Sequence, residues 1–129
     1  MAKVSRQTAA IEDVGILEDR SGELEGYTVN FLTFRRDIDH TPLMRGLPDD
    51  RCQCPHWGYV VKGRITYRFA GHEEVVEAGD AFHLPPGHIP VANEPGTEII
   101  QFSPTHELHE TQTVLRRNAQ AMLAAGQAG

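Results

Sequence analysis

Turn-forming residues interrupt the middle of this chain at short and regular intervals. After Gly63, apolar Ile65, Tyr67 and Phe69 alternate with polar residues, which is the period of a half-buried β-strand. Further short apolar runs follow, separated by Gly- and Pro-containing segments at residues 70–72, 78–80, 85–87 and 94–96. Short strands separated by turns about every 8 to 12 residues are typical of an all-β sandwich or barrel. A chain of 129 residues has room for one such domain.

The two ends of the chain differ from this middle. Residues 1–26 are polar, so we expect an irregular N-terminal extension. Alternation begins at Tyr27, and Ser103 with Pro104 is typical of a helix start, followed by an apolar stripe of helical period. We therefore expect the extension at 1–26, a barrel at 27–103, and a helix and tail at 104–129, all in one structural domain. The helix should reach about residue 124 and pack across the barrel or on a second copy of the chain.

The acidic composition limits the classes of partner. Asp and Glu number 18 against 12 Lys and Arg, the formal net charge is −6, and the basic residues form no stripe. Nucleic-acid binding needs a basic patch, so no nucleic acid is expected as a partner. No apolar run approaches the roughly 20 residues that span a bilayer, and no secretory signal is visible. We expect a cytoplasmic protein with no membrane partner.

The chain contains two cysteines, Cys52 and Cys54, which precede the alternating segment that follows Gly63. A disulfide between residues two apart would be badly strained. In a cytoplasmic protein the two residues would be free thiols, a metal pair or a redox pair. The alternative is that they pack as small buried residues, because cysteine is among the most buried residue types.

The stretch from Cys52 to Asn93 resembles the cupin superfamily. Gly79 is followed by five positions and then Pro85, Pro86 and Gly87, which matches the turn framework of the family motif G-x5-P-x-G-x2-H-x3-N. The segment 59–63, Tyr-Val-Val-Lys-Gly, is similar to the end of the other family motif, H-x-H-x3-E-x6-G. The resemblance implies an all-β, jelly-roll-like barrel, the double-stranded β-helix, with a C-terminal α-helix and a small cavity.

The family's metal ligands are not conserved in their usual form. By motif spacing, the glutamate position falls on His56, the two histidine positions on Cys52 and Asp50, and the histidine of the second motif on Pro90. An alternative alignment with a two-residue deletion places Cys52 and Cys54 over the two histidines. In neither alignment does the usual set of three histidines and one glutamate remain.

A different set of donors has the spacing of a metal site. Cys52, Cys54 and His56 are two residues apart, so on an extended segment all three project to one face. His88 lies two residues before Pro90 with the same parity. These four residues would form a Cys2His2 site for a divalent metal at the barrel mouth, with zinc favoured and iron, copper or nickel as alternatives. A metal-free cupin with the cysteines as packing residues is the competing interpretation.

Two functional classes follow. In the first, the chain is a metal-dependent enzyme acting on a small organic substrate, with the dioxygenase, isomerase, decarboxylase and lyase chemistry that the cupin resemblance implies. Tyr59 or Tyr67 would be a weak candidate for a catalytic acid if either faces inward. In the second, the chain is a non-catalytic module that binds a small ligand or a metal, because closed four-ligand sites are usually structural. The exposed barrel edge and the terminal helix suggest a homodimer, which the cupin resemblance also implies. We expect His83 to face outward and the aromatic residues to line the barrel and core: Trp57, Tyr59, Tyr67, Phe69, Phe82 and Phe102.

Overall fold

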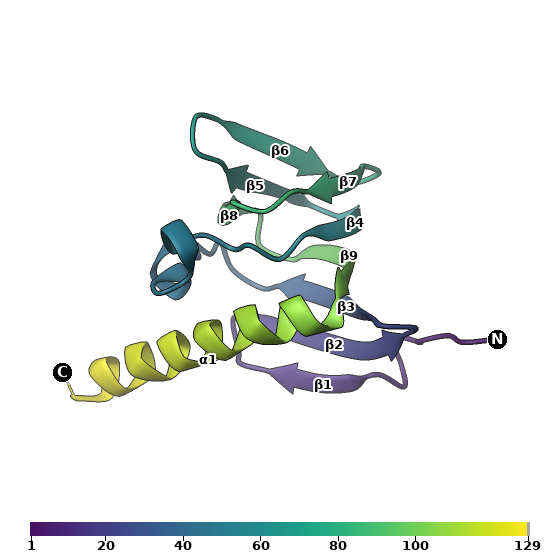
Figure 1. Ribbon diagram of the computed structural model, residues 1–129, viewed down its shortest axis with the longest axis horizontal. Helices are drawn as coiled ribbons and strands as arrows, with labels where there is room; N and C mark the ends of the chain where they lie inside the picture. Colours follow the sequence, from purple (N-terminus) through teal and green to yellow (C-terminus); the bar gives the residue numbers. More distant parts are fainter. Residues whose placement is uncertain (129) are drawn as a thin grey trace.

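The computed structural model describes residues 1–128, and β-strands dominate it (Figure 1). Two short 3-10 turns, η1 and η2, lie between β3 and β4, and one helix, α1, follows β9. Within this part of the chain, no helix is long and apolar enough to cross a membrane. The bounds are β1 Ala10–Asp13, β2 Leu17–Leu24, β3 Tyr27–Phe34, η1 Thr41–Met44, η2 Pro48–Asp50, β4 His56–Lys62, β5 Arg64–Arg68, β6 Glu73–Glu77, β7 Ala81–Leu84, β8 Ile89–Asn93, β9 Thr97–Pro104 and α1 Thr105–Ala128.

The strands form two antiparallel sheets. The larger has the order β1-β2-β3-β9-β4-β7 and the smaller the order β6-β5-β8. The main core lies between them and contains inward-facing side chains of both sheets, among them Val60, Ile65, Tyr67 and Ile99. These residues alternate with outward-facing neighbours, as the pleat requires. The expected all-β fold with a C-terminal helix is confirmed, although the hydrogen bonds of the two sheets do not close into a continuous barrel.

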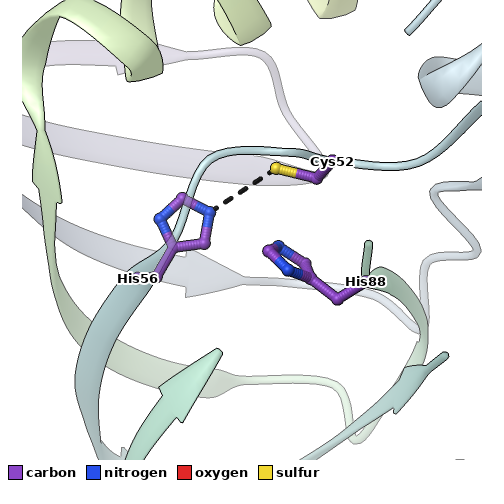
Figure 2. Close-up of side chains that lie close together, drawn as sticks. All are labelled: Cys52, His56 and His88. Atoms are coloured by element: carbon purple, nitrogen blue, oxygen red, sulfur yellow. Dashed lines mark hydrogen bonds between the residues drawn. The ribbon is translucent and has the colours of Figure 1, made fainter. Parts of the chain in front are cut away.

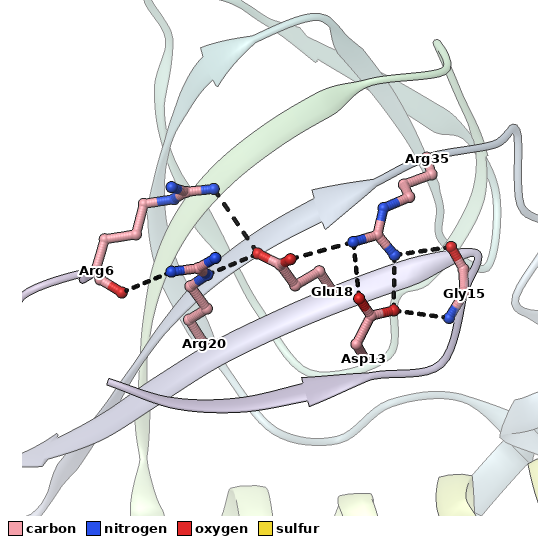
Figure 3. Close-up of polar contacts among 6 residues, drawn as sticks. All are labelled: Arg6, Asp13, Gly15, Glu18, Arg20 and Arg35. Atoms are coloured by element: carbon pink, nitrogen blue, oxygen red, sulfur yellow. Dashed lines mark hydrogen bonds and ion pairs between the residues drawn. The ribbon is translucent and has the colours of Figure 1, made fainter. Parts of the chain in front are cut away.

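The expectation that residues 1–26 are irregular is wrong. They contain β1 and the eight-residue strand β2, which pairs with β3 along its whole length. The sequence of β2 has no apolar alternation, because hydrogen bonds and ion pairs between polar side chains, rather than burial of apolar side chains, stabilise one of its faces. Glu18 accepts hydrogen bonds from Arg20 at 2.7 Å and from Arg35 at 3.1 Å (Figure 3).

The C-terminal helix is present and packs on the fold. The prediction placed its start at residue 104, whereas β9 includes Pro104 and α1 begins at Thr105. The helix lies against η1, β3 and β9 (Figure 1). Its buried Leu108 joins a second core cluster with Met44, Cys52 and Cys54. The candidate cysteines are therefore enclosed between the helix and the strands.

Candidate metal centre

Three of the four predicted donor residues meet in the interior. The sulfur of Cys52 and one ring nitrogen each of His56 and His88 all lie within 4.8 Å of one another (Figure 2). The exposed fractions of the three residues are 3%, 6% and 1%. The two imidazole rings are 5.1 Å apart between centroids and meet edge to face. Cys52 and His56, four residues apart, and His88 from a later segment thus place one thiol and two imidazoles around a common point.

The backbone fixes this arrangement. His56 is the first residue of β4, and His88 follows the turn at Pro85–Gly87, directly before β8. Cys52 and His88 face each other in an isolated antiparallel bridge, in which the Cys52 N–H donates to the His88 carbonyl at 3.0 Å. The Gly87 N–H donates to the Cys52 carbonyl at 2.8 Å. Gly87 has a φ of +97°, which glycine adopts without strain.

Each histidine has a hydrogen-bond partner on the nitrogen that faces away from the cluster. His88 Nδ1 lies 2.9 Å from the Pro85 carbonyl, and because a carbonyl only accepts, Nδ1 carries the proton and Nε2 keeps its lone pair. His56 Nδ1 lies 2.6 Å from Ser103 Oγ, and His56 Nε2 lies 3.7 Å from Cys52 Sγ. Partners of this kind orient histidine ligands in metal sites.

Ser103 is a site residue that the sequence interpretation missed. It was assigned to the helix N-cap, whereas its buried hydroxyl belongs to β9 and reaches His56. Parity along β9 was the available signal: Ser103 lies four residues after the inward-facing Ile99, and an even spacing in a strand preserves the face.

Burial sets the protonation states of the cluster. It lowers the pKa of His56 to about 3, with the neighbouring His88 as a second cause, and it also lowers the pKa of His88. It raises the pKa of the Cys52 thiol to about 11. At neutral pH the cluster therefore holds neutral imidazoles and a protonated thiol. In space, Ser103, His56 and Cys52 lie in the order of an orienting group, a base and a nucleophile. The raised pKa of Cys52 and the lowered pKa of His56 nevertheless oppose a thiolate–imidazolium pair.

Cys54 lies outside this group of three. It is buried at a bend, its thiol donates to the Pro55 carbonyl at 3.5 Å, and burial raises its pKa to about 12. The segment 53–55 is not a strand, so the alternation that would bring Cys54 beside Cys52 does not hold there. Both cysteines are free thiols.

Of the two tyrosine candidates, Tyr67 lies in the core and Tyr59 lies on the surface. Tyr67 is buried, and its ring stands perpendicular to that of His88 with centroids 6.0 Å apart. Tyr59 points outward from β4. Like Trp57 and Phe102, it is at least 40% exposed, so the expectation that these three aromatic residues line the barrel and core is wrong. His83 is exposed, as expected.

Two surface cavities do not reach the donor cluster. One of about 170 Å³ lies beside α1 and is lined by polar residues of β1, β2 and the helix, including Asp19 and Arg116. The other, of about 180 Å³, lies over β3, β9 and β4 and includes Phe31, Val61 and Ile100. Neither is lined by any of the three donors.

Comparisons with known proteins agree with this fold. Residues 52–92 match the family model described as Cupin domain. A search of curated proteins gave no match. Among solved structures, an RmlC-like cupin from Shewanella frigidimarina NCIMB 400 is 25% identical, with a TM-score of 0.55, and the alignment covers 78% of this chain and 88% of the other.

Two further solved structures share the fold at lower identity. KdgF from Halomonas sp. is 21% identical, with a TM-score of 0.53 and coverage of 81% of this chain and 94% of the other. The polyketide cyclase RemF from Streptomyces resistomycificus is 18% identical, with a TM-score of 0.55 and coverage of 81% and 79%. Taken together with the two antiparallel sheets, these findings show that the chain has a cupin fold and that its segment 52–92 matches the cupin domain.

Proposed function

We propose that this cupin binds one divalent metal ion, zinc in the first instance, through Cys52 Sγ, His56 Nε2 and His88 Nε2. The observation that carries the proposal is the 3.7 Å distance between Cys52 Sγ and His56 Nε2. A tetrahedral zinc with Zn–S near 2.3 Å and Zn–N near 2.0 to 2.1 Å separates its sulfur and nitrogen ligands by about 3.6 Å. The donor types also suit iron, copper or nickel.

The chain holds these donors in the state that a metal requires. Both imidazoles are neutral, and the hydrogen bonds to Pro85 and Ser103 hold the rings by their far nitrogens. The Cys52 thiol must lose its proton on binding, so metal binding would release a proton. Two neutral ligands and one thiolate would leave a net charge of +1 on a divalent centre. That charge is favourable for holding an anionic or polarised oxygen.

Three protein ligands leave one tetrahedral position for water or substrate, which is the arrangement of catalytic zinc. A metal there supplies Lewis-acid polarisation of an oxygen or an activated water. We infer an enzyme acting on a small organic molecule, with the reaction among those of cupin dioxygenases, isomerases, decarboxylases and lyases. The polyketide cyclase among the structural neighbours supports the small-molecule class. Tyr67 is the protein group placed to hold or donate a proton, because it is the tyrosine candidate beside the cluster.

A non-catalytic metal-binding module is the second candidate. Cys54 is buried two residues from Cys52, and neither cavity opens on the donors. Rotation of the Cys54 side chain toward the cluster would add a fourth protein ligand. Such a Cys2His2 site is closed to substrate, and closed sites are usually structural.

Metal content of variants tests the proposal. Untagged protein purified without chelator should hold close to one equivalent of metal by ICP-MS. Cys52→Ser, His56→Ala and His88→Ala should each lose most of it. His83→Ala is the matched control, because it removes an imidazole from the exposed outer surface. Equal metal content in all four variants, or less than about a tenth of an equivalent in the parent protein after each metal is offered, would overturn the assignment.

A fifth variant separates the two candidates. In the open site Cys54 is not a ligand, so Cys54→Ser should keep the metal of the parent protein. In the closed site the same change removes a ligand and should lower the metal content as Cys52→Ser does. The Cys54→Ser result therefore distinguishes a site with a free coordination position from one without.

A further inference from the structure

A segment without β-strands packs against the donor cluster. Residues 41–51 run from η1 through η2 to the residue before Cys52, and we call them the cover segment. Its Met44 is 3% exposed and packs in the core cluster that contains Cys52 and Cys54. Leu47 packs against the same cluster. The cover segment therefore encloses the side of the donor cluster on which Cys52 lies.

The three donors are closed off from solvent. Each is at most 6% exposed, and in the part of the chain that the structure describes, neither surface cavity is lined by any of them. A metal ion or a substrate can reach the donors only if part of the fold moves. The part that moves most easily is one whose displacement breaks few hydrogen bonds and little packing.

The backbone hydrogen bonds of the cover segment leave it free of the sheets. The Leu47 N–H donates to the Met44 carbonyl at 3.2 Å, and the Asp50 N–H donates to the Leu47 carbonyl at 2.8 Å. The Gly46 N–H donates to Asp50 Oδ1 at 3.1 Å. Among the described residues, no backbone group of 41–51 is hydrogen-bonded to the backbone of a strand. The segment can therefore move as a unit without breaking the sheet ladders.

Both ends of the cover segment are anchored at the same place. The His40 N–H, just before the segment, donates to the Pro90 carbonyl at 2.9 Å. The Cys52 N–H, just after it, donates to the His88 carbonyl at 3.0 Å. Pro90 belongs to β8, and His88 directly precedes that strand. The cover segment is thus a flap whose two fixed ends lie at the start of one strand.

The other element that packs on this cluster, α1, is held more firmly at its start. It continues directly from β9, and the Thr105 N–H donates to the Gly26 carbonyl at 3.0 Å. The Thr105 and Thr28 hydroxyls are 2.8 Å apart, which ties the helix to β3. Leu108, three residues later, is the helix residue buried in the cluster. Displacing this part of α1 would break these contacts, whereas the cover segment has none of them.

A side chain of α1 holds the cover segment in place. Asn118 Nδ2 donates to the Leu43 carbonyl at 2.6 Å and to the Arg45 carbonyl at 2.8 Å. The two carbonyls flank Met44, the residue that packs beside Cys52. One amide group therefore fixes the middle of the flap, 73 and 75 residues away in sequence.

The cover segment also contains two unfavourable backbone conformations. Asp49 and Asp50 have φ values of +56° and +54°, in the left-handed region. Residues other than glycine populate this region sparsely and persist there where surrounding contacts impose it. Opening would let both residues relax, while exposure of Met44 would oppose it. The closed position is favoured, and the open one is accessible.

We propose that the cover segment is a lid that opens when Asn118 releases it and admits a metal ion and a substrate to the donor cluster. This role rests on the proposed metal site, whereas the opening itself does not. Closed over a bound substrate, the lid would exclude water from the site.

Thiol labelling of metal-free protein measures the opening. In the presence of chelator, DTNB reacts with Cys52 and Cys54 when they become exposed, so the labelling rate follows the population of the open state. Asn118→Ala should raise this rate about 10-fold, because each of its two lost hydrogen bonds typically contributes a factor of about 2 to 12. In metal-loaded protein the same variant should speed metal release to a chelator.

Two further variants make the comparison specific. Asn118→Asp keeps the shape of the side chain but replaces its donors with acceptors, so it should raise the labelling rate at least as much. Gln120→Ala is the matched control, because it removes an exposed amide from the same helix, and it should label at the parent rate. Far-UV circular dichroism should be the same for all of these proteins.

Hydrogen exchange measured by mass spectrometry locates the movement. Peptides from residues 41–51 should exchange faster in Asn118→Ala than in the parent protein, while peptides from β4 and β9 should exchange equally in both. Low concentrations of urea should change the labelling rate little, because a local opening exposes little surface.

Two results would overturn the lid. One is an equal labelling rate in Asn118→Ala, Asn118→Asp and the parent protein. The other is a labelling rate that rises with urea as steeply as global unfolding, because the thiols would then react in the unfolded chain alone. Metal content of the parent protein is measured separately. Full metal content with unchanged labelling would remove the lid and leave the metal site, and faster labelling without bound metal would do the reverse.

Discussion

Replacing His40 with phenylalanine is expected to make the protein more resistant to acid. His40 is buried in the loop before η1, and its ring packs edge to face on Phe34 with centroids 5.9 Å apart. Its Nε2 has no hydrogen-bond partner in the part of the chain that the structure describes. The backbone N–H of His40 donates to the Pro90 carbonyl at 2.9 Å, a bond that any residue except proline would keep. Phenylalanine therefore preserves the ring packing and removes the titratable nitrogen.

The size of the effect follows from the histidine's pKa. Burial lowers the pKa of His40 from 6.5 to about 4, while an unfolded histidine keeps a pKa near 6.5. Between these values the unfolded chain takes up a proton that the folded chain does not. The contribution of His40 to stability is thus fully present above about pH 6.5 and is lost as the pH falls toward 4. The loss between pH 7 and pH 5 is about 2 kcal/mol, a large share of the 5 to 15 kcal/mol that stabilises a typical domain.

Urea unfolding followed by circular dichroism, at pH 7 and at pH 5 with chelator present, measures this difference. The parent protein should lose about 2 kcal/mol more than His40→Phe between the two pH values. The other buried histidines, His56 and His88, titrate in both proteins, so the comparison isolates His40. Equal losses in the two proteins would refute the reasoning, because they would mean that His40 is not buried as a neutral ring.

Two more predictions concern the site and the strand turns. Ser103→Ala should lower metal affinity by about 10- to 100-fold in a chelator competition, because His56 would lose the partner of its Nδ1. An unchanged affinity would show that Ser103 does not orient the ligand. Gly63→Ala should lower the free energy of unfolding by more than about 1 kcal/mol, because Gly63 has a φ of +86° and an added Cβ would meet Thr97. Gly71→Ala is the control, since among the described residues no atom other than those of Gly71 and its two chain neighbours lies within 4 Å of the added Cβ. Equal stability of the two variants would contradict the prediction.

The strands that the sequence predicted are those in which burial and pleat act together. In β5, Ile65 and Tyr67 are buried while Arg64 and Arg68 are exposed, so the hydropathy pattern reports the face directly. In β2 the residues Asp19 and Arg20 are both partly buried, and neither face is apolar. Backbone pairing with β3 and the ionic network stabilise that strand. No period in side-chain hydropathy marks such a strand, which is why the extension was predicted to be irregular.

The aromatic residues of β4 were misplaced for a related reason. Trp57 and Tyr59 alternate with His56 and Val60, and the period of two is correct. What hydropathy could not assign was the direction, because both faces of this strand are apolar. The buried residues are His56 and Val60, so the histidine faces the core and the tryptophan faces out. A strand with two apolar faces needs cover on both, and within the described chain the second sheet covers only the inner one.

The difference between Cys52 and Cys54 has a consequence for function. The spacing argument treated 52–56 as one extended segment, which brings every second side chain to the same face. Pro55 lacks an N–H for a strand ladder, and Cys54 lies at a bend, so the pleat is interrupted between Cys52 and His56. Cys52 is held instead by its bridge to His88. The gathered donors therefore number three. In the proposed metal site the fourth coordination position would belong either to a substrate or to Cys54 after a side-chain rotation. The local geometry around Pro55, rather than the composition of the site, would then distinguish the proposed enzyme from the proposed binding module.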